Sequence, residues 1–385
     1  IRYVLDIAKA LGSLKIYVVL GHKSDMVKKV LSESVIAVEQ PKMLGTADAV
    51  KCAENYFRSY RGDVLIMCAD TPLLNKATVK RIVQKHKKSK TACTFLTAVV
   101  HDPKGYGRII RGNGGGVVAI REDKDAVGFE RDIAEINVGV YCCESKELFN
   151  ALKEIKMNKK KKEFYLTDII EFFFEKGLKV ATVETEDPFE GLGINTREDL
   201  AMAETILRQK ILKDFMLQGV TIVDPSMTYI DVNAKIGYDT VIYPFTFIEA
   251  DVRIGSNCQI GPFARIRSGT RIEKKVEIGN FTEVSRAKVG SGTFMKHFSF
   301  VGDSSIGENV NIGAGMVTAN FDGQQKHPTK IADGAFIGSG AILVAPAKIG
   351  KKAVIGAGSV VPKGKTIPDG SVAVGVPAKI ISKKE

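Results

Sequence analysis

The sequence predicts an α/β domain followed by a parallel β-helix of hexapeptide repeats. Two observations carry this prediction. In the carboxy-terminal half, branched aliphatic residues recur at every sixth position from Ile230 to Val284 and again from Ile331 to Ile367. In the amino-terminal half, short apolar runs alternate with helical patterns, which is the rhythm of an α/β sheet.

The six-residue period belongs to neither an α-helix nor an ordinary strand. It fits one flat strand and one tight corner per repeat, so three repeats close a triangular coil and each repeated residue points at its axis. Nine of the isoleucines are followed directly by glycine, which supplies corners where a Cβ would collide. A β-sandwich is disfavoured, because its strands alternate every two residues. The repeated residues are Ile230, Ile236, Ile242, Ile248, Ile254, Ile260, Ile266, Ile272, Ile278 and Val284, then Phe300, Ile306 and Ile312 after a slip, then Ile331, Ile337, Leu343, Ile349, Ile355, Val361, Ile367 and Ala373.

The α/β domain is predicted to span residues 1–195 and to contain a mostly parallel sheet. Residues 196–219 predict one amphipathic helix that bridges the two domains and opens on a capping box from Thr196 to Asp199. The strands of the first domain are expected at Ile16–Leu20, Val64–Cys68, Cys93–Val100, Val138–Cys142 and Val180–Val183.

The β-helix is predicted over residues 220–385. Only the polar stretch 320–330, which contains Gly323 and Pro328, leaves the repeat, and we expect it to bulge from a coil. The rest of the segment from Ile230 to Ile367 then makes about seven coils of roughly 18 residues each.

Composition narrows the class of protein and its partners. A chain of 385 residues with 44% hydrophobic composition fits a globular protein of two or three domains. It has neither an apolar run of about 18 residues nor a signal peptide pattern, so we expect a cytoplasmic protein without a membrane partner. The six cysteines are scattered without a CxxC pair and are expected to be reduced thiols. The net charge of +12 suits anionic metabolites, and no aromatic-interleaved basic stripe indicates a nucleic-acid partner.

Several segments of the first domain have residue types that bind ligands. Asp70 follows the buried-looking strand 64–69, where it could hold Mg²⁺ or cap a turn. The glycine loop 44–47 leads into a helix and could hold a phosphate or a uracil edge. The loop Gly105–Arg108 allows close backbone approach to a ligand or forms a simple turn. Asn137 and Asn195 could each cap or bind.

Taken together, these segments resemble a known family of bifunctional enzymes. The segments LGTADAV, the strand end at Asp70, DPKGYGRI, REDKDA, EINVGV, FYLTDII and EGLGIN resemble, in order and spacing, the uridylyltransferase domain of N-acetylglucosamine-1-phosphate uridylyltransferase/glucosamine-1-phosphate acetyltransferases. The segments GPFARIR, IGNFTEV, VGDSSIGENVNIGAG, TANFDG and IGSG with LVAP resemble the acetyltransferase half. The pair of halves covers nearly the whole chain and is far more specific than either motif set.

For the first domain, the resemblance implies a Rossmann-like nucleotidyltransferase. It would join N-acetylglucosamine 1-phosphate to UTP and release pyrophosphate, with catalysis mainly by positioning and by charge neutralisation from Mg²⁺. Asp70 and Asn195 would bind the metal beside the UDP-sugar. By the same resemblance the uridine would be held by Gln40, Gly45 and Thr46, and the sugar by Gly107, Glu122 and Asn137.

For the second domain, the resemblance implies a left-handed β-helix that forms a homotrimer and uses acetyl-coenzyme A to acetylate glucosamine 1-phosphate. His297 matches the catalytic histidine, and His327 on the polar loop competes for that role. A neutral imidazole can take the proton that the acceptor amine must lose. The acceptor would be bound by Arg267, Glu283 and Asn311. The coenzyme groove would be lined by Ala314, Asn320, Phe321, Ser339 and Ala357.

The chain also departs from the family pattern. Ser285 stands in place of a phosphate-binding lysine, with Arg286 next to it. Phe300 and Phe321 replace tyrosines and so remove two hydroxyls, each worth a hydrogen bond of about 1 kcal/mol. The coenzyme-binding arginine expected near Gly375 is absent.

The family's first strand and its glycine-rich triphosphate loop precede Ile1, which is not an initiator methionine, so the chain resembles a fragment. We therefore expect little or no uridylyltransferase activity from these 385 residues, and two unpaired sheet edges. Two alternatives remain open: a nucleotidyltransferase for another sugar phosphate with a structural or regulatory β-helix, and a non-enzymatic assembly subunit. Coenzyme A binding separates the last of these from the bifunctional enzyme.

Overall fold

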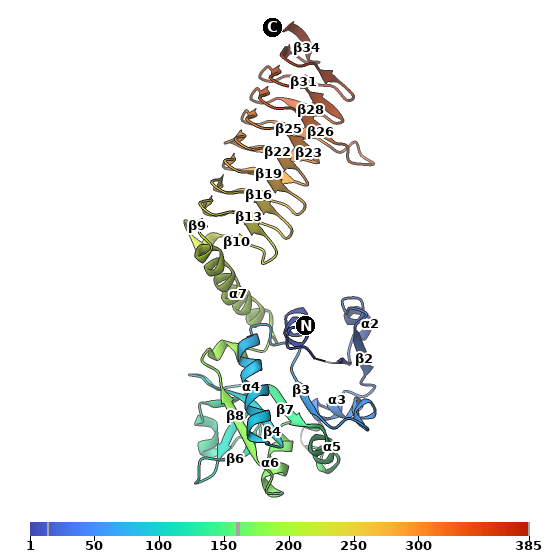
Figure 1. Cartoon of the computed structure of the whole chain (residues 1–385), viewed down its shortest axis with the longest axis vertical. Helices are drawn as coiled ribbons and strands as arrows, with labels where there is room; N and C mark the ends of the chain where they lie inside the picture. Colours follow the sequence, from blue (N-terminus) through green and yellow to red (C-terminus); the bar gives the residue numbers. More distant parts are fainter. Residues whose placement is uncertain (14, 159–161, 384–385) are drawn as a thin grey trace. The chain divides into compact units, whose positions relative to one another are not determined.

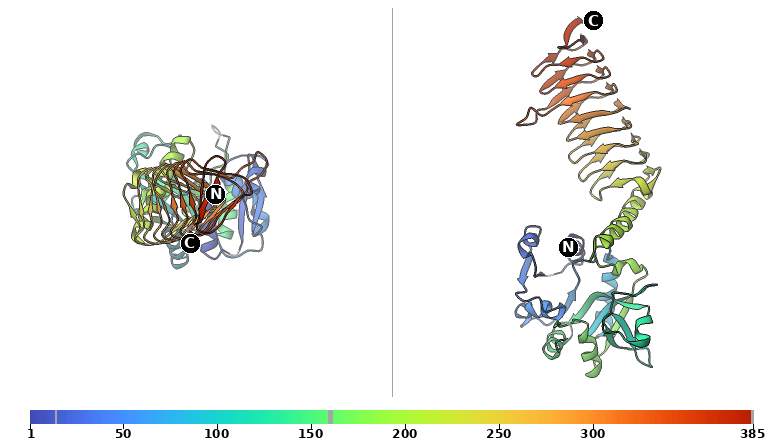
Figure 2. Two further views of the ribbon diagram at one scale, coloured as in Figure 1. Left: turned by 90° about the horizontal axis from the view of Figure 1, so that it is seen from above. Right: turned by 180° about the vertical axis from the view of Figure 1, so that it is seen from behind.

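The structure is a computed structural model that describes residues 1–13, 15–158 and 162–383. The chain divides into two compact units, residues 1–203 and 204–385, and each is described by itself. Figure 1 and Figure 2 show the elements of both units. No helix in the described part of the chain is long and apolar enough to cross a membrane.

The first unit has two sheets. A parallel pair, β1 and β2, stands apart from a sheet with the order β6-β5-β7-β4-β8, in which β3 also pairs with β7. The strands are β1 (Ile16–Leu20), β2 (Val35–Glu39), β3 (Asp63–Ile66), β4 (Cys93–Val99), β5 (Arg108–Arg111), β6 (Val117–Arg121), β7 (Glu135–Glu144) and β8 (Val180–Glu184). The helices are α1 (Arg2–Ala10), α2 (Ser24–Lys28), α3 (Thr46–Cys52), α4 (Lys76–Ser89), α5 (Ser145–Glu154) and α6 (Asp168–Glu175), with the 3₁₀ turns η1 (Glu54–Phe57), η2 (Gly128–Asp132) and η3 (Pro188–Gly191).

Helices cover both faces of the larger sheet, so β4 is buried on both sides. Its alternate residues enter two different cores: Phe95 packs with the α5 and α6 side chains, and Leu96 packs with Val79 and Ile82 of α4. Such two-sided burial explains why the sequence of β4 is a continuous apolar run. The five predicted strands are all present, with ends shifted by up to a few residues.

The expectation of a mostly parallel sheet is wrong for the larger sheet. Among its pairs only β4 and β8 run parallel, because the long strand β7 returns antiparallel between β4 and β3. Within the described residues, β1 pairs only with β2 and β3 only with β7, so each leaves one edge unpaired, as expected.

Helix α7 (Arg197–Leu217) begins at the predicted capping box. The Asp199 N–H donates to Thr196 Oγ1 at 3.1 Å, and the Thr196 N–H donates to Asp199 Oδ2 at 2.8 Å. The two side chains therefore satisfy backbone donors that the first helical turn leaves open.

The second unit is a left-handed parallel β-helix with three sheets, one on each side of the coil. The first sheet contains β10 (Tyr229–Ile230), β13 (Phe247–Ile248), β16 (Arg265–Ile266), β19 (Thr282–Ser285), β22 (Ser299–Gly302), β25 (Val317–Ala319), β28 (Ile342–Val344) and β31 (Val360–Val361). The second contains β11 (Lys235–Ile236), β14 (Arg253–Ile254), β17 (Arg271–Ile272), β20 (Lys288–Val289), β23 (Ser304–Ile306), β26 (Thr329–Ile331), β29 (Ala347–Ile349) and β32 (Thr366–Ile367). The third contains β9 (Thr221–Ile222), β12 (Val241–Ile242), β15 (Gln259–Ile260), β18 (Glu277–Ile278), β21 (Phe294–Met295), β24 (Asn311–Ile312), β27 (Phe336–Ile337), β30 (Val354–Ile355), β33 (Ser371–Val374) and the antiparallel β34 (Lys379–Lys383). A short 3₁₀ turn, η4 (Pro225–Met227), precedes β10.

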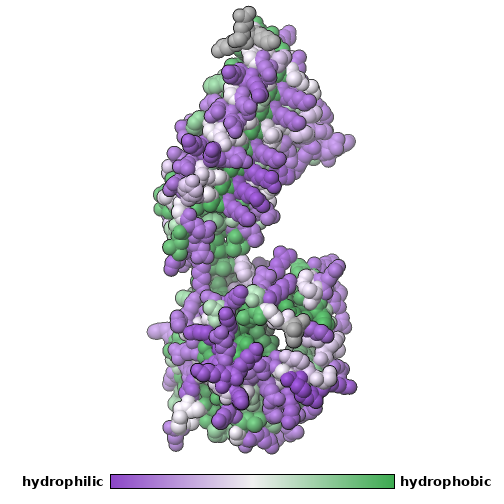
Figure 3. Space-filling view, viewed as in Figure 1, coloured by the Kyte–Doolittle hydropathy of each residue, from purple (hydrophilic) through white to green (hydrophobic). Residues whose placement is uncertain are grey.

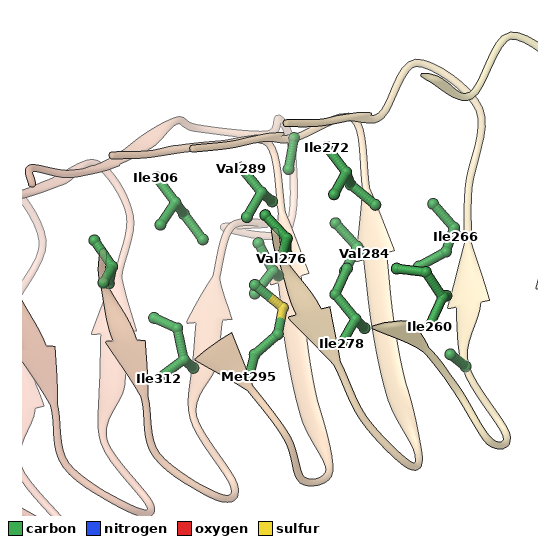
Figure 4. Packing of buried hydrophobic residues seen from close by; sticks show 14 of the residues in the cluster. Ile260, Ile266, Ile272, Val276, Ile278, Val284, Val289, Met295, Ile306 and Ile312 are labelled. Atoms are coloured by element: carbon green, nitrogen blue, oxygen red, sulfur yellow. The ribbon is translucent and has the colours of Figure 1, made fainter. Parts of the chain in front are cut away.

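The repeated aliphatic residues fill the axis of the coil, as predicted. Ile260, Ile266 and Ile272 point inward from three consecutive strands (Figure 4) and are at most 3% exposed. Strands β10 to β32 make seven complete coils and two further strands, in agreement with the expected number. On the face drawn in Figure 3, hydrophilic side chains cover most of the coil surface, and hydrophobic ones show in patches between them.

The expectation that Phe300 points at the axis is wrong. The inward residue is Val301, which is fully buried, and the pattern runs without a gap through Val289 and Met295. Two corners are shortened by one residue, after Val284 and again after Val301. The chain turns there through left-handed residues, Arg286 (φ 49°) and Asp303 (φ 48°). The predicted bulge at 320–330 leaves the coil between β25 and β26 (Figure 1).

Candidate functional site

Gln40, Gly45 and Thr46, predicted to hold the uridine, lie together at the start of α3. Gly45 has a φ of 105°, and a Cβ there would lie 2.5 Å from the carbonyl oxygen of Phe164, so only glycine fits. Gln40 Nε2 donates to the Gly45 carbonyl at 3.1 Å, and Thr46 Oγ1 accepts from the Leu166 N–H at 2.9 Å. The glycine loop is therefore fixed against the segment 164–166, which belongs to the FYLTDII motif.

Gly107, Glu122 and Asn137, predicted to hold the sugar, also meet. The Asn137 N–H donates to the Gly107 carbonyl at 2.8 Å. A Cβ on Gly107 would lie 3.6 Å from Asn137 Cβ and 3.8 Å from Glu122 Oε1. Glu122 accepts a hydrogen bond from Thr167 Oγ1 at 2.7 Å, which joins this group to the uridine group through residues 164–167.

The carboxylates beside this group are partly desolvated. Burial raises the pKa of Glu122, and the Thr167 hydroxyl only partly offsets the effect. Burial, together with the charge of Glu122, raises the pKa of Asp168 to about 6. Sequence reasoning did not single out Thr167 and Asp168. The available signal was the threonine and aspartate directly before an apolar helical run.

Asp70 and Asn195, predicted to bind the metal, flank Gly193. Asp70 Oδ2 and Asn195 Nδ2 lie 3.8 and 3.7 Å from the position that a Cβ of Gly193 would take. The Ile194 N–H donates to the Asp70 carbonyl at 3.0 Å and fixes the two loop segments side by side. Both side chains are exposed, and an exposed carboxylate and amide suit Mg²⁺, which prefers oxygen ligands and keeps several waters. The residues present therefore fit the ion.

Arg108, at the end of the predicted ligand loop Gly105–Arg108, forms an ion pair within the protein. Arg108 is 3% exposed and pairs with Asp123 at 2.8 Å. It therefore stabilises the loop that presents Gly107.

In the β-helix, the predicted base and three predicted coenzyme residues form one column. His297, Ala314, Ser339 and Ala357 each lie two residues after an inward residue of the adjacent strands β21, β24, β27 and β30. The Gly340 N–H donates to the Ala314 carbonyl at 2.7 Å, and the Gly358 N–H donates to the Ser339 carbonyl at 2.8 Å. The column therefore occupies the same corner of four successive coils.

The His297 side chain is exposed, and within the described residues its imidazole makes no hydrogen bond. Its backbone carbonyl accepts from Ser299 Oγ at 2.9 Å and from Thr282 Oγ1 at 3.3 Å, which holds the corner in place. His327, by contrast, has its Nε2 2.6 Å from Asp322 Oδ2, and Lys363 bonds to the same oxygen. The geometry thus separates the two candidates: one imidazole is accessible and the other is held by a carboxylate.

The predicted acceptor residues lie on the strands next to this corner. Arg267 Nη1 donates to Glu283 Oε1 at 3.0 Å across neighbouring coils, and Glu283 pairs with Phe300 between β19 and β22. Thr282, directly before Glu283, is the residue that bonds the His297 carbonyl. Asn311 lies on β24, opposite Phe294 of β21, on the far side of the same corner.

A second polar network joins the shortened corners to the coenzyme residue Asn320. Arg286 bonds Asp303 through two nitrogens at 2.6 and 2.8 Å, and Asn320 Nδ2 donates to Asp303 Oδ2 at 2.5 Å. Hydrogen bonds from Arg286 lower the pKa of Asp303. Ser285 is buried and accepts from Arg286 Nη1 at 2.8 Å, so it does not face a ligand. Phe321 is 59% exposed on the loop.

Comparisons with known proteins agree with this two-part arrangement. Residues 2–193 match the family described as nucleotidyl transferase, and residues 233–268 and 328–363 match the family described as bacterial transferase hexapeptide (six repeats). The protein described as bifunctional protein GlmU of Shouchella clausii is 41% identical over 90% of this chain and 84% of its own length. The proteins of the same description from Pelotomaculum thermopropionicum and Acetivibrio thermocellus are 41% and 38% identical over 90% of this chain and 83% of their own length. The chain therefore belongs to the GlmU family of bifunctional proteins, in which an acetyltransferase and a sugar-phosphate uridylyltransferase are joined in one chain.

Proposed function

We propose that the two activities of this family are carried out by the residue groups described above, with His297 as the base of acetyl transfer. The family to which this chain belongs acetylates glucosamine 1-phosphate with acetyl-coenzyme A and joins the product to UTP, giving UDP-N-acetylglucosamine and pyrophosphate. The observation that carries the assignment of residues is the column that places His297 at the same corner as Ala314, Ser339 and Ala357.

For acetyl transfer, the acceptor ammonium must first lose a proton. The exposed imidazole of His297 takes it, the free amine attacks the thioester carbonyl carbon, and the coenzyme leaves as a thiolate that regains a proton. Arg267 binds the acceptor phosphate, and its contact with Glu283 orients the guanidinium. Asn311 contacts the sugar or the incoming amine, and Asn320 and Phe321 complete the coenzyme groove.

For uridylyl transfer, Gln40, Gly45 and Thr46 bind the uridine. The backbone hydrogen bonds of Leu44 and Ala47 with Phe164 support this assignment, because they hold the loop in one shape. We assign the sugar to Gly107, Glu122 and Asn137. Mg²⁺, held by Asp70 and Asn195, would neutralise phosphate charge when bound.

We further propose that the β-helix assembles as a homotrimer. Phe245, Phe263 and Phe281 occupy one corner of successive coils, with ring centroids 4.6 and 5.0 Å apart, and each ring is at least 43% exposed. An exposed row of apolar rings favours burial against another subunit.

Phe263→Asp should lower the mass of the assembly measured by light scattering. Phe129→Asp, at a 76% exposed phenylalanine of the first unit, is the control. A Phe263→Asp protein that keeps the parent mass would exclude this row from the interface.

The acetyltransferase assignment is tested by thiol release from acetyl-coenzyme A. Release should require glucosamine 1-phosphate and should not occur with glucosamine or glucose 1-phosphate. We expect His297→Ala to abolish release while coenzyme binding persists, and His327→Ala to retain it. Parent-rate release by His297→Ala would transfer the role of base to another group.

A further inference from the structure

A mixed cluster of metal-binding side chains lies outside the groups described so far. Asp63 at the start of β3, His86 on α4 and Cys142 on β7 each offer one ligand atom, and the three atoms lie within 4.8 Å of one another. The cluster sits at the amino end of β3, whereas Asp70 follows its carboxyl end. It is therefore separate from the residues proposed to bind the metal and the UDP-sugar in the first unit.

Two threonine hydroxyls already hold the ring of His86. Thr91 Oγ1 and Thr94 Oγ1 each lie 3.2 Å from His86 Nδ1 and 2.8 Å from each other. If Nδ1 donates its proton to these hydroxyls, Nε2 presents a lone pair on the opposite side of the ring. Hydroxyls that fix the tautomer and orientation of a histidine in this way are typical of metal sites.

The three candidate ligand atoms, in contrast, are only weakly paired. His86 Nε2 is 3.3 Å from Asp63 Oδ1, longer than a usual charge-assisted hydrogen bond. The Cys142 side chain is 1% exposed, and within the described part of the chain its thiol makes no hydrogen bond. The three candidate ligand atoms therefore lie within 4.8 Å of one another, with one long contact between His86 and Asp63.

The cluster is accessible from solvent. A pocket of about 600 Å³ is lined by Asp63 and His86, and Glu144 lies on the same wall. The pocket lining is balanced in charge, because it contains the acidic residues Asp63, Glu144 and Glu147 and the basic residues Lys87, Lys90 and Lys179. Asp63 and His86 of the cluster line this pocket and Cys142 does not, so a cation would reach the cluster from the side of Asp63 and His86.

We propose that Asp63, His86 and Cys142 bind one zinc-class divalent cation, which clamps β3, α4 and β7 together. An oxygen, an imidazole nitrogen and a sulfur form the borderline-soft ligand set that Zn²⁺ and Co²⁺ prefer. The all-oxygen pair Asp70 and Asn195 suits Mg²⁺ instead. The two sites are thus separated by both ligand chemistry and position.

Cation binding must displace the thiol proton of Cys142. Burial lowers the pKa of His86, which favours the neutral imidazole that a ligand must be. Burial raises the pKa of Cys142, so without a cation it remains a thiol. Binding forms the sulfur–metal bond and releases the thiol proton to solvent, and no redox step is involved.

The experiment is a Co²⁺ titration of the full chain after dialysis against a chelator. We expect one equivalent to produce a thiolate-to-cobalt absorption band, and added Zn²⁺ to displace it. Cys142→Ala should remove the band. Cys143→Ala is the matched control, because Cys143 is the next residue on β7, is equally buried and packs in the core on the other face of the sheet.

Asp63→Asn provides a second variant that does not disturb the core, because its side chain is 32% exposed. It should weaken Co²⁺ binding by roughly 10- to 100-fold and abolish the rise in melting temperature that Zn²⁺ gives the parent. The proposal is overturned if the parent gives no band, if the band survives in Cys142→Ala, or if Asp63→Asn binds Co²⁺ as the parent does. Acetyl transfer is expected to be unchanged in Asp63→Asn.

Discussion

Gly279 controls the position of the proposed base, although it makes no contact with a substrate. It follows the inward residue Ile278, and a Cβ there would lie 1.8 Å from the Lys296 carbonyl oxygen and 2.4 Å from its carbon. Ordinary contacts of this kind begin near 3.4 Å. Gly279→Ala must therefore displace the Lys296 peptide by well over about 1 Å, and His297 is the next residue.

A displacement of about 1 Å at a reacting group costs on the order of 100-fold in rate. We therefore expect Gly279→Ala to lower the kcat of thiol release by about that factor. Gly237→Ala is the matched control. Its Cβ would meet the backbone of Ser256 at 2.6 Å, where the corner after β11 packs against the corner after β14 in the next coil. It should cost stability but leave kcat unchanged.

Both variants are first compared with the parent by circular dichroism and light scattering. A Gly279→Ala protein that is folded and assembled like the parent, yet retains its kcat, would refute the link between this corner and the chemistry. Equal losses of kcat in both variants would show that general loosening of the coil, and not the place of His297, sets the rate.

Three further outcomes follow from buried and charged groups. Because the pKa of Asp168 is raised to about 6 in the folded chain, stability should fall as pH rises from about 4 to 6, and Asp168→Asn should flatten this dependence. The shift sets an upper limit of about 3 kcal/mol on the change in the free energy of unfolding, which solvent screening reduces to about 1 kcal/mol. Denaturant unfolding across that pH range measures the change, and equal pH profiles of the parent and Asp168→Asn would contradict the prediction. Ile260→Ala, at a fully buried axis position, should lower the free energy of unfolding by about 2–5 kcal/mol, and a loss below about 1 kcal/mol would mean that the coil collapses around the gap. Arg267→Ala should raise the KM for glucosamine 1-phosphate by roughly 10- to 100-fold in steady-state assays with kcat little changed, and an unchanged KM would remove it from the phosphate site.

The β-helix could be predicted from the sequence because closing a triangular coil demands an inward aliphatic residue in every strand. The prediction failed at Phe300 because two corners are one residue short, and an adjacent phenylalanine and valine give the same apolar signal. The left-handed Arg286 and Asp303 shorten the corners, and their ion pair crosses from one coil to the next. Only the folded chain reveals that contact.

The first unit was less predictable. The apolar runs located its strands, but nothing in the pattern of β7 encodes that it runs antiparallel to β4. The candidate ligand-binding segments were proposed from glycine loops, strand ends and the family resemblance, all of which are read from local sequence. The hydrogen bond between Thr167 and Glu122, and the meeting of Asp63 with Cys142, depend on the tertiary fold and have no local signal.

The column of His297, Ala314, Ser339 and Ala357 has a length that is fixed by the spacing of the coils. Neighbouring strands advance by about 4.8 Å, so the three steps from His297 to Ala357 span roughly 14 Å along the axis. Insertion or loss of a whole coil between them would change this span by one step and leave the core unaltered. The length of the proposed coenzyme groove is therefore set by a whole number of coils, and evolution can adjust that length only in discrete increments.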